Sequence, residues 1–189
     1  MQNLPNILTL LRIAVIPLFV GAFYLGGTLA AWVAFGLFVT AAVTDYFDGM
    51  LARKLGVTSP FGACLDPIAD KLLVFAALFM LVGSQPQLLI PAVIIAFREV
   101  LISGMREYLA KAGVDLKVTG LAKWKTTVQM TAISAVILSG GFSDAATAGG
   151  LLTLGVVLMW VAVILTVLTG VDYVRKALPH LRWSSSTPD

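Results

Sequence analysis

The sequence predicts an all-α membrane protein with six transmembrane helices in one domain. Hydrophobic residues make up 59% of the 189-residue chain, charged residues make up 12%, and the mean hydropathy is +0.94. Soluble globular domains carry about 25% charged residues. Four long segments contain no charged side chain, namely residues 13–44, 72–97, 126–143 and 145–171. Because a helix needs roughly 20 apolar residues to cross a bilayer, these segments favour several crossings.

Turn signals divide the long apolar runs into individual helices. Gly26-Gly27-Thr28 interrupts the first run, and the sequence GSQPQ, which begins at Gly83, interrupts the second. The resulting helices are expected near residues 7–26, 29–51, 66–83, 88–110, 121–140 and 147–173. Together they form one transmembrane catalytic domain over residues 1–177, and residues 178–189 form a polar cytoplasmic tail.

The cationic residues are expected at one face of the membrane. The connections at 26–28, 83–87 and 140–146 contain no Lys or Arg, whereas the other connections and the C-terminal segment contain Arg53, Lys54, Lys111, Lys117, Lys123, Lys125, Arg175, Lys176 and Arg182. Short cytoplasmic loops are enriched in Lys and Arg, so both termini are expected in the cytosol. The sequence pI of about 9.2 then reflects topology and attraction to anionic lipid, and it does not indicate nucleic-acid binding.

Four aspartates are expected to meet at the same membrane face. Asp45 and Asp48 are spaced i, i+3 near the end of the second predicted helix, and Asp66 and Asp70 are spaced i, i+4 at the start of the third. The connecting sequence KLGVTSPF contains Gly and Ser-Pro turn signals. We therefore expect an antiparallel hairpin in which the two pairs of carboxylates face each other.

Such a cluster of carboxylates requires cations, because like charges near hydrocarbon are unfavourable. Oxygen ligands without His or Cys favour Mg²⁺ or Mn²⁺, and four carboxylates suit two ions about 4 Å apart. Small residues on the same helix faces, Gly49, Ala52, Gly62 and Ala63, have two interpretations. They allow close helix packing, or they leave space for a flat ligand such as a pyrophosphate. The residues themselves indicate phosphoryl-type chemistry.

The stretch DYFDGMLARKLGVTSPFGACLDPIAD, from Asp45 to Asp70, follows the pattern D-x2-D-G-x2-A-R-x8-G-x3-D-x3-D. It resembles the signature of the CDP-alcohol phosphotransferase family, and every position of that signature is filled. The resemblance covers nearly the whole chain and implies the six-helix fold of that family. It also implies that the four aspartates bind two divalent cations, Mg²⁺ or Mn²⁺, and that Asp70 acts in addition as the general base.

The same resemblance implies a binding site for the nucleotide of CDP-diacylglycerol. The residues implied by the signature are Gly49, Ala52, Arg53 and Gly62. Small side chains would leave space for the ligand, and the arginine would contribute charge. Asn6, Thr9 and Arg12 in the first predicted helix are further candidates for the pyrophosphate, with an equally good structural role at a helix start.

Cationic residues in the fourth and fifth predicted helices provide a candidate site for the second substrate. Glu99 and Arg106 lie on one helical face with Arg98 beside it, and Lys123 and Lys125 begin the next helix. One interpretation is a buried ion pair of Glu99 with Arg98 or Arg106, together with lysines that extend toward the membrane surface. The other is a cationic pocket for a phosphorylated alcohol.

Three further segments sharpen the resemblance: NLPNILTLLRIAVIP, REVLISGMRE and KWKTTVQ. They are similar to segments of bacterial family members that use sn-glycerol 3-phosphate as acceptor. This similarity implies an enzyme of phospholipid biosynthesis in the bacterial cytoplasmic membrane, with its active site on the cytosolic side. It implies that the acceptor phosphate is bound by Arg98, Arg106, Lys123 and Lys125.

Two alternatives remain at this point. The acceptor could be another alcohol, such as inositol phosphate, on the same fold. A divalent-cation transporter could also use carboxylates within a membrane. The small residues of the sixth predicted helix would allow a homodimer.

Overall fold

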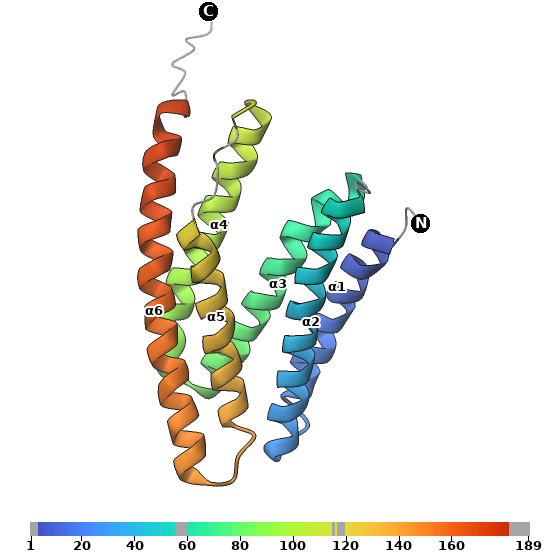
Figure 1. Ribbon diagram of the computed structural model, residues 1–189. Coiled ribbons are helices and arrows are strands. Elements are labelled where there is room, and N and C mark those ends of the chain that lie inside the picture. The colour runs from blue at the N-terminus through green and yellow to red at the C-terminus, as the bar shows by residue number, and fades with distance from the viewer. Residues whose placement is uncertain (1–3, 56–59, 115, 117–119, 182–189) are drawn as a thin grey trace, which may run out of the picture.

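The computed structural model describes residues 4–55, 60–114, 116 and 120–181, and for residues 4–9, 45–55, 60–67 and 70 it describes the backbone alone. The described residues form six α-helices and two short 3₁₀-helices, without a strand (Figure 1). The α-helices are α1 (Leu4–Ala22), α2 (Gly27–Leu55), α3 (Pro60–Ser84), α4 (Leu89–Lys111), α5 (Gly120–Ser139) and α6 (Ala145–Ala177). The 3₁₀-helices are η1 (Pro86–Leu88) and η2 (Leu178–His180).

The six predicted helices are present, and their boundaries differ from the prediction by up to six residues. Two of these differences have an identifiable reason. α1 ends at Ala22, and a turn leads to Gly26 and Gly27, whose φ angles of 77° and 59° lie in the left-handed region that glycine adopts without strain. α3 begins at Pro60, six residues earlier than expected. Proline is well suited to the first turn of a helix, where its missing N–H needs no partner. The Ser-Pro signal therefore starts α3, and Asp66 and Asp70 lie well inside it.

Length and composition make several of these helices suitable for a membrane. Among the described residues, three helical segments are long and apolar enough to cross one: Gly27–Thr44, Pro86–Lys111 and Ala145–His180. Leu10–Ala22 and Lys71–Ser84 are shorter apolar segments. Large apolar side chains such as Leu18, Phe79 and Phe97 are more than 60% exposed, as expected for surfaces that contact lipid. The chain is therefore an all-α membrane protein.

The helices run alternately up and down, so their connections gather at two ends of the molecule (Figure 1). The turns α1–α2, α3–α4 and α5–α6 lie at one end and contain no Lys or Arg. The opposite end holds both chain ends together with the last turns of α4 and α6, which carry Lys111, Arg175 and Lys176. Lys111, Arg175 and Lys176 thus lie at one end of the protein as predicted, whereas Lys117 and Arg182 fall outside the described residues.

One apolar core joins all six helices. Each helix contributes a side chain that is less than 2% exposed, and these are Phe19, Phe38, Leu78, Ile95, Ile133 and Met159. Figure 1 shows α1, α2 and α3 side by side on one side of the molecule and α4, α5 and α6 on the other. Contacts of α2 with α5, and of α3 with α4 and α5, connect the two groups.

The start of α6 is fixed by an N-terminal cap. The Asp144 carboxylate accepts hydrogen bonds from the backbone N–H of Thr147 at 2.8 Å and from its hydroxyl at 2.7 Å. These bonds hold the pKa of Asp144 below its ordinary value. The cap therefore stabilises the fold above the ordinary pKa of aspartate, and its contribution is lost as the pH falls through the lowered pKa.

α5 and α6 approach each other closely at Gly155. A Cβ atom at this position would lie 2.5 Å from Val136 Cγ2, 3.0 Å from the Val136 backbone nitrogen and 3.2 Å from the Ala132 carbonyl oxygen. Small residues allow such close approach of helices within membranes. The backbone atoms cannot move aside without displacing α5, so this contact fixes the position of α5 relative to α6.

We predict that Gly155→Ala lowers the melting temperature of the protein in detergent, because overpacking typically costs about 1–3 kcal/mol. Gly150→Ala is the matched control on the same helix, since nothing lies within 4 Å of a Cβ atom at Gly150. It should leave the melting temperature unchanged or raise it, because alanine is the better helix former. Equal effects of the two substitutions would contradict the packing role of Gly155.

Candidate functional site

We refer to Asp45, Asp48, Asp66 and Asp70 as the aspartate motif. It lies on α2 and α3, at the end of the molecule where Lys111, Arg175 and Lys176 lie (Figure 1). Asp45 and Asp48 belong to the last third of α2, and Asp66 and Asp70 belong to the first half of α3. The side chains of these four residues lie outside the described part of the structure, as do those of the predicted nucleotide-binding residues Gly49, Ala52, Arg53, Gly62, Asn6 and Thr9. The expected convergence of the carboxylates therefore stays a prediction.

The positions of Asp45 and Asp48 on α2 lie on the same side of the helix as buried residues two turns earlier. Asp45 follows Phe38 by seven residues, and Asp48 follows Ala41 by seven. Seven residues are about two helical turns, so each pair of positions shares a face of the helix. Phe38 and Ala41 are at most 5% exposed. The positions of Asp45 and Asp48 therefore extend the face that α2 turns toward the core.

The same relation holds on α3. Asp66 precedes Leu73 by seven residues, and Asp70 precedes Ala77 by seven. Leu73 and Ala77 are at most 2% exposed. Both pairs of aspartates thus occupy core-facing positions at the same end of the bundle, and a set of four carboxylates there suits hard divalent cations. Among the side chains that are described, no three His, Cys, Asp or Glu residues lie together.

The described site is centred on the Glu99 carboxylate of α4. Its Oε1 atom accepts a hydrogen bond from Lys125 Nζ of α5 and another from Arg98 Nη1 at 3.2 Å. The exposed fractions of the side chains are 18% for Glu99, 15% for Arg98 and 6% for Lys125. We refer to Arg98, Glu99 and Lys125 as the Glu99 cluster. It carries an excess of positive charge within the bundle.

Two residues of α6 hold Arg98 in place, and neither was predicted from the sequence. Arg98 Nη2 donates a hydrogen bond to the Thr169 hydroxyl at 3.2 Å, and that hydroxyl donates in turn to the Leu165 carbonyl at 2.7 Å. A Cβ atom on Gly170 would lie 3.2 Å from Arg98 Cγ. The guanidinium of Arg98 is therefore fixed by α6 as well as by Glu99.

The four cations predicted to bind the acceptor occupy three different settings. Arg98 and Lys125 share Glu99. One of the two interpretations of the sequence expected the pair of Glu99 with Arg98, but neither expected Lys125 to be buried against Glu99. Arg106 lies eight residues further along α4, about 12 Å by helical rise, with its guanidinium 5.9 Å from the centre of the Tyr173 ring. Lys123 is exposed. The structure therefore brings together two of the four predicted residues.

Two more cations extend the positive charge into the first group of helices. Arg12 of α1 is only 4% exposed. Lys71 of α3, the residue after Asp70, lies close enough to Glu99 and Lys125 to affect both electrostatically. Lys71, one residue from Asp70 on α3, therefore lies within electrostatic range of the Glu99 cluster across the boundary between the two groups of helices.

Comparison with known proteins shows where the chain is similar. A model of the CDP-alcohol phosphatidyltransferase family matches residues 2–168, which include the aspartate motif and the Glu99 cluster. A Cereibacter sphaeroides protein named CDP-diacylglycerol--glycerol-3-phosphate 3-phosphatidyltransferase is 43% identical over 95% of this chain and 97% of its own length. A Rickettsia bellii protein of the same name is 43% identical over 92% of this chain and 94% of its own. An Oryza sativa subsp. japonica protein named cardiolipin synthase (CMP-forming) is 39% identical over 92% of this chain and 57% of its own.

We predict that Glu99→Gln destabilises the protein in detergent, because it leaves Arg98 and Lys125 without their shared anion. Removing one partner of a buried ion pair typically costs about 3–5 kcal/mol. Glu107→Gln is the matched control on the same helix, since Glu107 forms an exposed pair with Lys111 at 2.9 Å and exposed pairs contribute little. Melting temperatures of the two variants measure the difference. A Glu99→Gln protein as stable as the Glu107→Gln protein would show that the cluster does not depend on its carboxylate.

Proposed function

The chain belongs to the CDP-alcohol phosphatidyltransferase family, and from this premise we propose that it transfers the phosphatidyl group of CDP-diacylglycerol to sn-glycerol 3-phosphate. The products are phosphatidylglycerophosphate and CMP. The observation that carries this assignment is the 43% identity, over nearly the full length of both chains, to proteins named for that reaction. It makes the chain an enzyme and argues against a cation transporter.

Asp45, Asp48, Asp66 and Asp70 would hold two divalent cations, Mg²⁺ or Mn²⁺. Their core-facing helix positions and all-oxygen donor set support this assignment. When bound, such cations neutralise the charge of a pyrophosphate and polarise the phosphorus that is attacked. Gly49, Ala52, Arg53 and Gly62 would receive the CDP group beside them, and Asn6, Thr9 and the buried Arg12 would contribute from α1.

The Glu99 cluster is the part of the described structure best suited to the phosphate of glycerol 3-phosphate. Arg98 presents a guanidinium fixed by Glu99 and Thr169, and Lys125 presents an ammonium fixed by Glu99. Charge-assisted hydrogen bonds from such groups are strong and directional. Arg106 and Lys123 would contribute at the outer end of the same site, where Arg106 is close to Tyr173.

In the proposed reaction, Asp70 accepts the proton of the primary hydroxyl of glycerol 3-phosphate. The hydroxyl oxygen attacks the phosphorus on the lipid side of the pyrophosphate. A new P–O bond forms as the bond to the bridging oxygen breaks, and CMP leaves with that oxygen. Lys71, which follows Asp70 directly in α3, links the aspartate motif to the Glu99 cluster.

We propose that all six helices cross the bacterial cytoplasmic membrane and that residues 1–177 form one catalytic domain. The end that carries the Lys and Arg residues faces the cytosol, since cytoplasmic loops are rich in these residues (Figure 1). Both termini and the active site would then lie on the cytosolic side, where glycerol 3-phosphate is available. Open space beside Gly149 and Gly150 of α6 would allow a homodimer.

A product assay tests the proposed function. Purified protein in mixed micelles receives CDP-diacylglycerol, Mg²⁺ and one acceptor, and we expect CMP and phosphatidylglycerophosphate with glycerol 3-phosphate. Phosphatidylglycerol is the main rival acceptor, because one similar protein is named cardiolipin synthase (CMP-forming). Inositol phosphate is a second. Faster release of CMP with either rival than with glycerol 3-phosphate would overturn the proposed acceptor but leave the family assignment intact.

For the aspartate motif, we predict that Asp45→Asn, Asp48→Asn and Asp66→Asn each reduce turnover below about a tenth of wild type at saturating Mg²⁺, because each removes a metal ligand. The proteins should remain folded in the membrane. Asp172→Asn is the control, since Asp172 forms an exposed pair with Lys176. Partial rescue at higher metal concentration would support the ligand role. Near-normal turnover of any one variant would remove that residue from the metal site.

For the acceptor site, we predict that Lys125→Gln raises KM for glycerol 3-phosphate on the order of ten- to a hundredfold, as expected for the loss of a charge-assisted phosphate contact. The apparent affinity for CDP-diacylglycerol should change little. Lys111→Gln is the control, because Lys111 forms an exposed pair with Glu107 and has no part in the proposed site. If Lys125 only neutralised Glu99, stability and the affinities for both substrates would instead fall together.

A further inference from the structure

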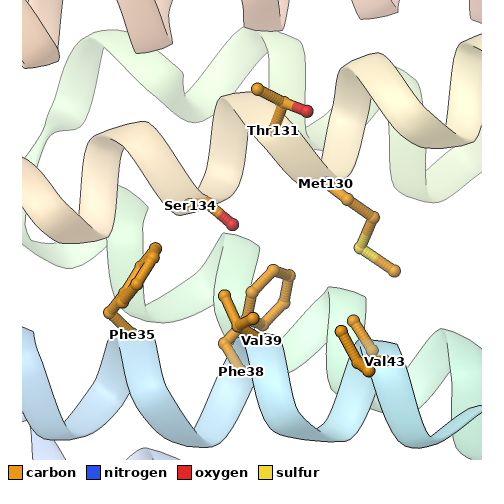
Figure 2. Close-up of a pocket in the computed structure, with 8 residues that line it drawn as sticks. Phe35, Phe38, Val39, Val43, Met130, Thr131 and Ser134 are labelled. Atoms are coloured by element: carbon orange, nitrogen blue, oxygen red, sulfur yellow. The ribbon is translucent and has the colours of Figure 1, made fainter.

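Several threonines in the described helices donate a hydrogen bond to a carbonyl of their own helix, four residues earlier. Thr131 of α5, which Figure 2 shows beside an apolar groove between α2 and α5, donates to the Thr127 carbonyl at 2.9 Å. Thr153 of α6 donates to the Gly149 carbonyl at 2.8 Å. Such a bond satisfies the hydroxyl proton inside the bundle, so it needs no functional explanation.

Thr169 of α6 makes a second contact, and this contact reaches another helix. Its hydroxyl donates to the Leu165 carbonyl at 2.7 Å and accepts a hydrogen bond from Arg98 Nη2 of α4 at 3.2 Å. A hydroxyl has a single proton, and here that proton is used within α6, so the oxygen lone pairs are left to accept from Arg98. Thr169 is 5% exposed. It therefore offers the guanidinium a buried acceptor of fixed direction.

Gly170, the next residue of α6, makes room for the stem of the same arginine. A Cβ atom on Gly170 would lie 3.2 Å from Arg98 Cγ and 3.6 Å from Arg98 Nε. The first distance is tighter than an ordinary van der Waals contact. The absence of a side chain at Gly170 thus lets the stem of Arg98 pass close to the α6 backbone and brings its guanidinium to Thr169.

The bond to Thr169 limits the pairing of Arg98 with Glu99. A guanidinium and a carboxylate favour a two-point pair with two parallel hydrogen bonds. In this structure Glu99 accepts from Arg98 Nη1 at 3.2 Å, whereas Nη2 donates to Thr169. A guanidinium has more N–H donors than these two contacts use, and the Arg98 side chain is 15% exposed. Arg98 therefore keeps donors that a phosphate can engage.

We propose that Thr169 is a positioning residue for the acceptor, which it serves by holding Arg98 away from a two-point pair with Glu99. This inference rests on the proposed function, in which Arg98 binds the phosphate of glycerol 3-phosphate. Without the Thr169 hydroxyl, the guanidinium would turn its second nitrogen to Glu99 and lose donors for the phosphate. The proposal gives α6 a role in acceptor binding.

Thr169→Val tests the proposal, because valine has nearly the same shape but lacks the hydroxyl. We expect KM for glycerol 3-phosphate to rise roughly three- to tenfold, the effect of losing one hydrogen bond. The values of kcat and of the apparent affinity for CDP-diacylglycerol should stay within about twofold of wild type. Thr169→Ser keeps the hydroxyl and should restore KM. An unchanged KM in Thr169→Val, or an equal loss of affinity for both substrates, would overturn the proposal.

Thr166→Val is the matched control for removal of a hydroxyl from α6. Thr166 lies about one turn before Thr169 and is 0% exposed, and its hydroxyl oxygen has no hydrogen-bond partner among the described residues. We expect this variant to have the KM of wild type for both substrates. A rise in KM for glycerol 3-phosphate as large as that of Thr169→Val would show a general effect of packing in α6 and would overturn the proposal.

Thermal stabilisation by glycerol 3-phosphate measures acceptor binding without turnover, because a ligand that binds the folded protein raises its melting temperature. Thr169→Val should need roughly three- to tenfold more glycerol 3-phosphate than wild type for the same rise, and Thr166→Val should match wild type. Equal requirements in Thr169→Val and wild type would overturn the proposal. Either failure leaves the proposed function standing if wild type forms phosphatidylglycerophosphate, whereas a wild-type protein without that product would refute the function itself.

Discussion

The fold depends on the need to pair every charge that α4 and α5 carry into the bundle. Glu99 satisfies this constraint for two cations at once, since its carboxylate accepts hydrogen bonds from both Arg98 and Lys125. The bond from Arg98 to Thr169 extends the connection to α6. Three helices are therefore joined by polar contacts near the middle of α4, and the apolar core and the close contact at Gly155 join them as well. Because an unpaired charge in this setting is unfavourable, the register of these helices is tightly constrained.

Stability alone does not explain why the chain keeps these charges. Replacing a buried ion pair by apolar residues of similar size is often neutral or stabilising, and Ile133 and Val136, further along α5, show that this helix packs well with apolar side chains. A bound phosphate would neutralise the excess positive charge of the Glu99 cluster, and this role explains why the chain keeps the charge. The aspartate motif then holds the donor and the Glu99 cluster holds the acceptor, with Lys71 between them.

The sequence allowed the fold to be predicted well, because long uncharged runs and turn signals define membrane helices almost directly. It placed the start of α3 too late, since proline both ends helices and begins them, and Pro60 begins one. For Arg98 and Glu99 it left two interpretations, and the structure shows that the ion pair exists and includes Lys125. Lys123 and Lys125 looked equivalent, yet two residues along a helix point about 200° apart, and only Lys125 is buried. The contacts of Arg98 with Thr169 and Gly170 could not be predicted from the sequence. Both residues lie about 70 positions from Arg98, in a segment that looks like any apolar helix.

The central claim is that the positive charge which Glu99 leaves unneutralised in the Glu99 cluster binds the acceptor phosphate. The most direct measurement is made on Lys125→Met, which removes the excess positive charge of the cluster and leaves Arg98 paired with Glu99. Its melting temperature and its KM for glycerol 3-phosphate are compared with those of wild type. We predict a melting temperature within a few degrees of wild type and a KM raised at least tenfold, with unchanged apparent affinity for CDP-diacylglycerol. A large loss of stability with an unchanged KM would contradict this account.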